Sequence, residues 1–176
     1  MICVLLIALL SSCASLPKGA NPVTRFDVDR YLGTWYEIAR LDSRFERNLS
    51  NTLAQYRLDE PGRIQVQNSG YNEKKKEWVT ADGVAKFRGE TDRAALKVSF
   101  FGPFFSGYNV IALAGDYQYA LVAGKNLKYL WILSRSKSLP DSVRDDFLQR
   151  AREIGYDTEQ LIWVAHDKTS PFEDED

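Results

Sequence analysis

Apolar and polar residues alternate along most of the chain with a period of two, which is typical of β-strands that bury one face. The alternation is interrupted at turn residues, as in Glu60-Pro61-Gly62 and Gly115-Asp116. It predicts eight strands, at residues 34–41, 51–59, 63–71, 78–88, 94–100, 108–114, 117–124 and 128–135. Because short links join them, we expect each strand to run antiparallel to the next.

A single stretch after the eighth strand has helical spacing instead. It begins near Pro140 and ends at Gly155, and its apolar residues fall on one side, at Val143, Phe147, Leu148, Ala151 and Ile154. A short strand at residues 161–164 follows. An eight-stranded antiparallel meander with one packed helix predicts an all-β, closed up-and-down barrel with a C-terminal α-helix outside it. Such a barrel can hold one small ligand.

The chain opens with an apolar run from Ile2 to Leu10, which ends at Ser11-Ser12-Cys13. At about 9 residues and about 1.5 Å per residue, the run is too short to cross a bilayer of roughly 30 Å, but it suits a secretory signal. It resembles the lipobox of bacterial lipoproteins, which implies that residues 1–12 are a signal peptide and that Cys13 is lipidated with diacylglyceryl and acyl groups. An ordinary cleaved signal and a misassigned start codon are the alternatives, because no Lys or Arg precedes the run.

The rest of the chain divides into three predicted parts. Residues 13–25 are expected to form the lipidated cysteine and a flexible tether, residues 26–165 the barrel domain, and residues 166–176 an acidic, disordered tail. The residue after the cysteine is Ala14 rather than Asp, which under the sorting rule implied by the lipoprotein resemblance favours the outer membrane. We expect the domain to lie at the periplasmic face of that membrane.

Composition excludes several classes of site. Cys3 and Cys13 are the only cysteines, so the mature domain has no thiol for a disulfide, a cysteine-ligated zinc site or a nucleophile. Lys and Arg total 23 against 24 Asp and Glu, and no basic stripe suggests nucleic acid. The one histidine, His166, is expected outside the barrel, so neither a catalytic centre nor a metal or other cofactor is predicted.

Three motifs, in order, resemble those of the lipocalin family. Gly33-x-Trp35 stands at the start of the first strand, Gly115-Asp116-Tyr117 at the turn between the sixth and seventh strands, and Arg135 ends the eighth. Arg44-Phe45-Glu46-Arg47 and residues 98–104 are similar, more specifically, to bacterial lipocalin lipoproteins and their apolipoprotein D relatives. The resemblance covers residues 26–165 and implies a protein that stores or carries lipid at the outer membrane.

The same resemblance implies that Arg135 lies across the indole of Trp35 and plugs the base of the barrel, through a cation–π contact of roughly 0.5–2 kcal/mol. Counting alternate hairpins from the first strand brings the turn at Asp116 and the end of the eighth strand to this same, closed end. Gly33, Trp35, Asp116, Tyr117 and Arg135 are therefore expected to be structural residues.

Alternation within the strands assigns the side chains of the barrel interior. The expected ligand-binding residues of this cavity are Tyr56, Val66, Phe87, Leu96, Val98, Phe100, Tyr129 and Trp131. For residues 108–114, either set of alternate side chains could face the barrel interior. In the strand that contains Gly83, the assignment of inward-facing side chains is uncertain near that residue, because glycine often marks a bulge. The alternative is that these apolar side chains simply fill a solid core.

The connections at the other end of the barrel are expected to surround an open mouth. Phe101, Phe104 and Phe105 lie around a Gly-Pro turn and would form an apolar lip that meets lipid or ligand. They could instead fold back to cap the core. Arg44 and Arg47 belong to a mildly basic rim that suits phosphate head groups, although charge runs at turns are often only solvated.

The free energy of burying an acyl chain favours a lipid as the ligand. Burying roughly ten methylenes at about 0.8 kcal/mol each gives roughly 8 kcal/mol, which corresponds to micromolar binding before ordering costs. With charged groups expected largely at the rim, we predict a fatty acid or lysophospholipid whose tail enters the barrel. Glu37 lies two residues after Trp35, so alternation directs its side chain inward, and no partner is assigned to it. Alternatives are sequestration of haem or a siderophore and, less favoured, a lipocalin-type enzyme; a homodimer is left open.

Overall fold

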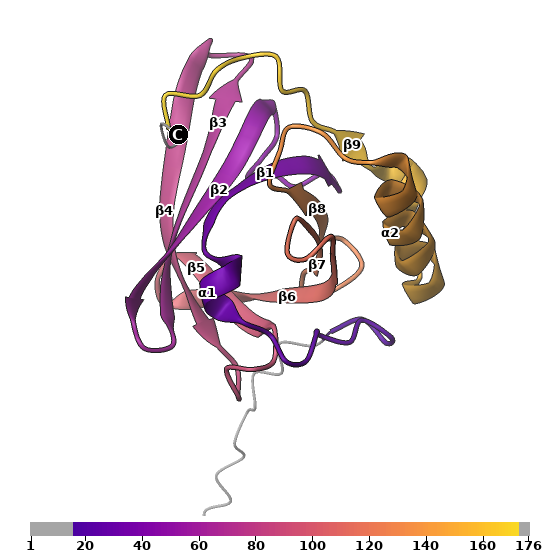
Figure 1. The fold of residues 1–176 in the computed structure, drawn as a ribbon. Coiled ribbons are helices and arrows are strands. Elements are labelled where there is room, and N and C mark those ends of the chain that lie inside the picture. The colour runs from indigo at the N-terminus through magenta and orange to yellow at the C-terminus, as the bar shows by residue number, and fades with distance from the viewer. Residues whose placement is uncertain (1–15, 173–176) are drawn as a thin grey trace, which may run out of the picture.

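The computed structural model describes residues 16–172 and contains a closed antiparallel barrel (Figure 1). Its strands follow the order β2-β3-β4-β5-β6-β7-β8-β1-β9, and β1 also pairs with β2, which closes the sheet. Every pairing between neighbours is antiparallel. The predicted eight-stranded up-and-down barrel is therefore confirmed, and β9 adds a short strand on the outside of β1.

The strand bounds agree with the alternation pattern to within a few residues at most ends. They are β1 (Gly33–Arg40), β2 (Leu49–Glu60), β3 (Arg63–Asn72), β4 (Glu77–Phe87), β5 (Ala95–Phe101), β6 (Phe104–Ala114), β7 (Tyr119–Ala123), β8 (Leu130–Ser134) and β9 (Ile162–Trp163). The largest difference is at β6, which begins at Phe104 because the β5–β6 hairpin pairs up to its tip, where Phe101 faces Phe104.

Helix α2 (Asp141–Ile154) lies outside the barrel, beside β8 and β9, as the sequence predicts (Figure 1). Its residues Phe147 and Ala151 are fully buried, and Gly155 ends the helix with φ of 106°, a conformation that glycine adopts without strain. Two short elements were not predicted, α1 (Val28–Tyr31) and the 3-10 turn η1 (Thr158–Gln160). No helix within residues 16–172 has the length and hydrophobicity needed to span a bilayer.

Two separate apolar clusters follow from the period-two alternation. One fills the inside of the barrel and includes Trp35, Tyr56 and Leu96. The other lies between the outside of the barrel and α2, and includes Ile38 and Phe147. Inward and outward side chains of the same strands thus supply two cores, which is why strands on the α2 side are apolar on both faces.

The segment before the barrel is packed against it, so the prediction of a flexible tether is wrong for residues 16–25. The backbone N–H of Val23 donates to the carbonyl of Val110 (2.9 Å), and the N–H of Ala94 donates to the carbonyl of Val23 (2.9 Å). Ala20 and Phe26 are buried. These contacts satisfy the backbone N–H of Ala94, just before β5, and the carbonyl of Val110 within β6. The signal peptide and Cys13 lie outside the described residues.

The C-terminal segment also departs from the expectation of disorder, at least as far as Phe172. Asn51 Nδ2 donates to the carboxylate of Asp167 (3.0 Å), and Asn51 Oδ1 accepts from the N–H of Lys168 (2.8 Å). The ring of Phe172 lies edge-on to Trp78, with centroids 6.4 Å apart. The segment therefore covers the outside of the barrel near β2 and β4; residues 173–176 lie outside the described residues.

Candidate ligand-binding site

The closed end of the barrel is sealed by an arginine on a tryptophan, as the family resemblance implied. The guanidinium carbon of Arg135 lies 3.9 Å from the ring centroid of Trp35, which is fully buried. Arg135 also donates to the carbonyls of Thr34 (2.8 Å) and Arg30 (2.8 Å). Trp35 Nε1 donates to the carbonyl of Tyr31 (2.8 Å). The stacked pair thus ties β1, β8 and α1 together at the base.

The remaining motif residues complete this base. Asp116 and Tyr117 have positive φ (60° and 68°) in the β6–β7 turn. Arg30 forms an ion pair with Asp116, and its guanidinium carbon lies 4.3 Å from the ring centroid of Tyr117, whose hydroxyl accepts from the N–H of Asp27 (2.8 Å). A Cβ on Gly33, at φ 89°, would meet Arg135 Nη1 at 3.5 Å. These contacts are structural in character and pack side chains across the base of the barrel.

Seven of the eight expected cavity residues pack in the inner apolar cluster: Tyr56, Val66 and Leu96 as buried members, and Phe87, Val98, Phe100 and Trp131 as partly buried ones. The eighth, Tyr129, is not part of that cluster and stacks on Trp131 with ring centroids 6.1 Å apart. Gly83 explains how Phe100 fits inside, because a Cβ there would lie 2.7 Å from Phe100 Cδ1. The interior is therefore apolar over most of its height.

The sequence left open which side chains of β6 face the barrel interior, and a bulge in the strand settles this. Pairing with β7 shifts register between Val110 and Ala112. As a result Tyr108, Val110 and Leu113 pack in the inner cluster, while Ala112 packs in the outer one. Both phases are thus used along one strand, a pattern that alternation alone does not show.

Three tyrosine hydroxyls form a hydrogen-bonded group inside the barrel, close to the base. The hydroxyl of Tyr108 lies 2.7 Å from that of Tyr31 and 2.9 Å from that of Tyr56. Burial raises the pKa of all three hydroxyls, so they are neutral in the folded protein. Sequence reasoning missed Tyr31, which lies in the unpredicted α1. Because each hydroxyl has a partner, the group can adjoin a hydrocarbon chain without an unmet hydrogen bond.

Charged side chains also enter the upper barrel, so the expectation that charge is confined largely to the rim is wrong. The register shift between Glu37 and Ala39 breaks the alternation of β1 and buries Glu37 and Arg40 together. Glu37 Oε1 accepts from Arg40 Nη1 (2.7 Å) and Thr52 Oγ1 (3.1 Å). Burial, and next the negative charge of Glu46, raise the pKa of Glu37 well above its ordinary value.

Glu46 reaches this group from the loop between β1 and β2. Its carboxylate accepts from Trp131 Nε1 (3.1 Å). Arg40 Nη2 donates to the loop carbonyls of Glu46 (3.0 Å) and Leu49 (2.9 Å). The interior charges therefore hold the loop against the mouth of the barrel, a role that no sequence motif indicated.

The phenylalanine lip projects into solvent rather than folding back over the core. Phe101, Phe104 and Phe105 are 70%, 79% and 41% exposed. Lys97 Nζ lies 4.9 Å from the ring centroid of Phe105. The rim residues are engaged locally: Arg47 pairs with Asp42 (2.7 Å), and the guanidinium carbon of Arg44 lies 4.7 Å from the ring centroid of the exposed Phe45.

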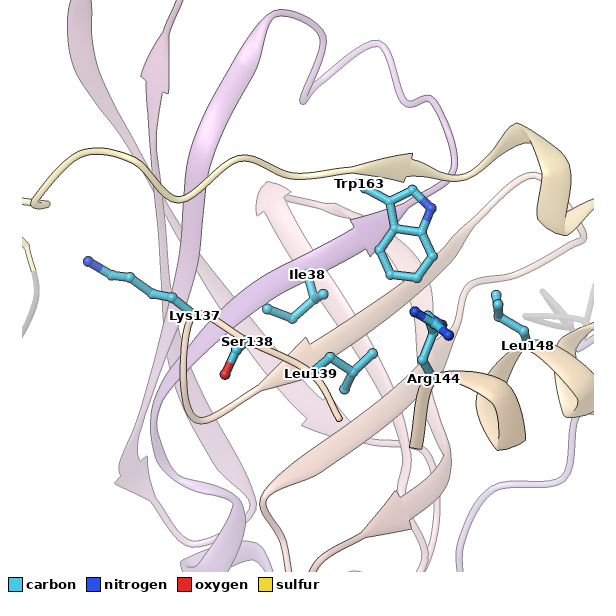
Figure 2. Close-up of a pocket in the computed structure, with 7 residues that line it drawn as sticks. All are labelled: Ile38, Lys137, Ser138, Leu139, Arg144, Leu148 and Trp163. Atoms are coloured by element: carbon cyan, nitrogen blue, oxygen red, sulfur yellow. The ribbon is translucent and has the colours of Figure 1, made fainter. Parts of the chain in front are cut away.

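A hollow lies outside the barrel, between β1, β9 and α2, and the sequence did not indicate it (Figure 2). It measures about 440 Å³ and is lined by Ile38, Lys137, Ser138, Leu139, Arg144, Leu148 and Trp163. Figure 2 shows Trp163 on one side of the groove and Arg144 and Leu148 on α2 at the other. Arg144 is already paired with Asp141 (2.8 Å) and Asp145 (3.1 Å), so the groove offers an anionic ligand little unmatched charge.

Comparison with known proteins agrees with this geometry. The sequence of residues 26–166 matches the protein-family model of the lipocalin-like domain. The chain is 50% identical over 158 residues to outer membrane lipoprotein Blc of Escherichia coli (strain K12), covering 89% of each chain. It is 48% identical over 158 residues to outer membrane lipoprotein Blc of Vibrio cholerae, covering 89% of this chain and 92% of that protein.

Solved structures show the same fold. Insecticyanin from the tobacco hornworm Manduca sexta superposes with a TM-score of 0.66 at 23% identity, covering 82% of this chain and 83% of that one. At this identity the likeness shows the barrel architecture alone. Together, the matched domain, the motifs at the barrel base and the 50% identity to Blc show that the chain belongs to the lipocalin family, within its outer membrane lipoproteins.

Proposed function

We propose that this protein binds a fatty acid or a lysophospholipid inside its barrel and stores or carries it at the outer membrane. The observation that carries the proposal is the inner apolar cluster, which extends from the sealed Trp35–Arg135 base toward a mouth with an exposed phenylalanine lip. One closed end and one apolar entrance favour a ligand that enters tail first.

Energetics support an acyl chain. Each methylene transferred from water into the apolar interior contributes about 0.8 kcal/mol, so about ten buried methylenes supply roughly 8 kcal/mol, which corresponds to micromolar affinity before the ordering costs of binding. The tyrosine hydroxyls near the base already bond one another and demand nothing from the ligand. Binding rather than catalysis is the role that such an interior supports.

The location at the outer membrane is that of the Blc relatives at 50% and 48% identity. We propose in addition that cleavage follows residue 12 and that lipid on Cys13 provides the anchor. Two acyl-bearing groups give durable attachment, whereas a single chain would be marginal. The packed segment from residue 16 would then leave only residues 14 and 15 between the lipid and the domain, and hold the domain close to the bilayer.

Native mass spectrometry of detergent-free protein, purified from its own membrane, tests the proposal. The expected result is a population carrying one acyl species, a fatty acid or a lysophospholipid, at about one per chain. Detection of a haem or a siderophore would overturn the lipid proposal in favour of sequestration of another small molecule. Protein that carries nothing, and that takes up no added lipid, would also overturn it.

A further inference from the structure

The connections at the open end of the barrel expose several large apolar side chains. Phe45 in the β1–β2 loop is 60% exposed, and Leu127 in the β7–β8 loop is 43% exposed. The phenylalanine lip of Phe101, Phe104 and Phe105 projects between them from the β5–β6 hairpin. Apolar side chains gathered on one exposed face usually meet an apolar partner.

The same connections carry an excess of positive charge. The strand-to-strand connections at the open end are residues 41–48, 73–76, 102–103 and 124–129. Together they contain seven Lys and Arg against three Asp and Glu. The connections at the closed end are residues 61–62, 88–94 and 115–118, with two Arg against three Asp and Glu. Apolar and basic side chains on one face suit the surface of a bilayer that contains anionic lipids.

The first described residues lie at this same end of the barrel. A Cβ on Gly19 would lie 3.8 Å from Cγ1 of Ile154, the last residue of α2. A Cβ on Gly155, which ends that helix, would lie 3.7 Å from Leu127 Cδ1 in the β7–β8 loop. From there the chain runs to the closed end, where the N–H of Asp27 donates to a hydroxyl of the β6–β7 turn (2.8 Å). The chain therefore enters the domain from the side of the mouth.

The length of chain before this point decides which end of the barrel a lipid on Cys13 brings to the membrane. Leu16 packs in the outer apolar cluster, three residues after Cys13. At no more than about 3.6 Å per residue, the link reaches about 11 Å at most. Strand β1 runs from the closed end to the mouth over 8 residues, about 26 Å at about 3.3 Å per residue. The link is too short to bring the closed end to the bilayer instead.

We propose that the mouth of the barrel docks on the surface of the bilayer that holds the anchor. The phenylalanine lip inserts among the lipids, and the basic connections face anionic head groups. The inference rests on the lipid anchor and the lipid cavity of the proposed function, and adds the surface that meets the membrane. In this orientation a lipid passes between the leaflet and the cavity without crossing water.

Docking of this kind depends on the anchor. The lip and the modest charge excess of the connections bind a membrane only weakly by themselves. The tether raises their local concentration at the bilayer, so weak contacts suffice. A Cys13→Ala domain without lipid is therefore still expected in the soluble fraction, and the docking is tested on the lipidated protein.

An environment-sensitive fluorescent label on a single cysteine tests the docking. Once residues 1–12 are removed, Cys13 is the only natural cysteine, and lipid on its sulfur leaves an introduced cysteine as the one free thiol. Phe104→Cys places the label on the lip. Leu58→Cys is the matched control, because Leu58 is also an exposed apolar residue (44%) but lies near the end of β2, at the closed end.

Both labelled, lipidated proteins are reconstituted into vesicles of phosphatidylethanolamine and phosphatidylglycerol. The Phe104→Cys label should gain emission by roughly twofold or more, and lipids that carry a nitroxide should quench it, because lipid replaces water around the label. The Leu58→Cys label should change little. Replacing phosphatidylglycerol by phosphatidylcholine, or adding salt, should reduce the Phe104→Cys response, since the attraction between the basic connections and the head groups is then removed or screened.

A Phe104→Cys label that responds no more than the Leu58→Cys label would overturn the docking. A response that is unchanged without phosphatidylglycerol would overturn the role given to the basic connections. Palmitate titration of the same preparations separates the docking from the proposed function. If palmitate binds while the lip stays in water, the docking alone fails; if the lip inserts but no palmitate binds, the lipid-binding function fails. Mass spectrometry that finds no lipid on Cys13 would contradict the anchor, and the argument from the tether with it.

Discussion

Trp35→Ala is the substitution that the fold should tolerate least. The side chain is fully buried at the base, donates to the carbonyl of Tyr31 and lies under Arg135. Removing a buried Trp costs about 3–5 kcal/mol. The lost cation–π contact adds about 1 kcal/mol. We expect the free energy of unfolding to fall by about 4–6 kcal/mol and Tm by roughly 10–20 °C.

Urea and thermal unfolding followed by far-ultraviolet circular dichroism measure this loss directly. Trp163→Ala is the matched control, because that indole is 48% exposed on β9 and its removal should cost no more than about 1 kcal/mol. An unfolding midpoint of Trp35→Ala within the range of the control would refute the argument that the Trp35–Arg135 pair closes and stabilises the barrel.

Three further substitutions test separate parts of the structure. Cys13→Ala should yield a folded periplasmic domain, and recovery of the variant with outer membranes after fractionation would contradict anchoring through that residue. Gly83→Ala should destabilise the barrel by about 1–3 kcal/mol in urea unfolding, because the new Cβ would meet Phe100 at 2.7 Å; Gly102→Ala, with open space around its Cβ, should not. Glu37→Gln should flatten the pH dependence of stability. Because the pKa of Glu37 is raised in the folded protein, its protonated form stabilises the fold fully below the ordinary pKa of 4.5, and this stabilisation is lost as pH rises through the folded-state pKa. If the stability of Glu37→Gln depends on pH as strongly as that of wild type, Glu37 does not have this effect.

Period-two alternation located all eight barrel strands because each buries one face inside the barrel. The same reasoning directs Tyr56, Val66 and Trp131 inward, and all three pack in the inner apolar cluster. It failed where a bulge changes the phase. Glu37 and Arg40, three residues apart on β1, face the same interior only because of the register shift between them.

Other features depend on contacts that local sequence does not encode. The hydroxyl of Tyr31 meets that of Tyr108 across 77 residues of chain, and Glu46 meets Trp131 across 85. The segments before and after the barrel have the composition of linkers, with Pro, Gly and acidic residues. They are ordered nevertheless by backbone and side-chain partners such as Val110 and Asn51 on the barrel wall.

Tryptophan fluorescence during titration with palmitate tests the central claim, that lipid binds inside the barrel. Trp131 packs in the inner cluster, whereas Trp163 lines the outer groove (Figure 2). Delipidated wild-type protein should show a saturable change in emission, Trp131→Phe should lose most of that change, and Trp163→Phe should retain it. Saturable binding whose signal survives in Trp131→Phe and disappears in Trp163→Phe would place the ligand in the outer groove and contradict the account.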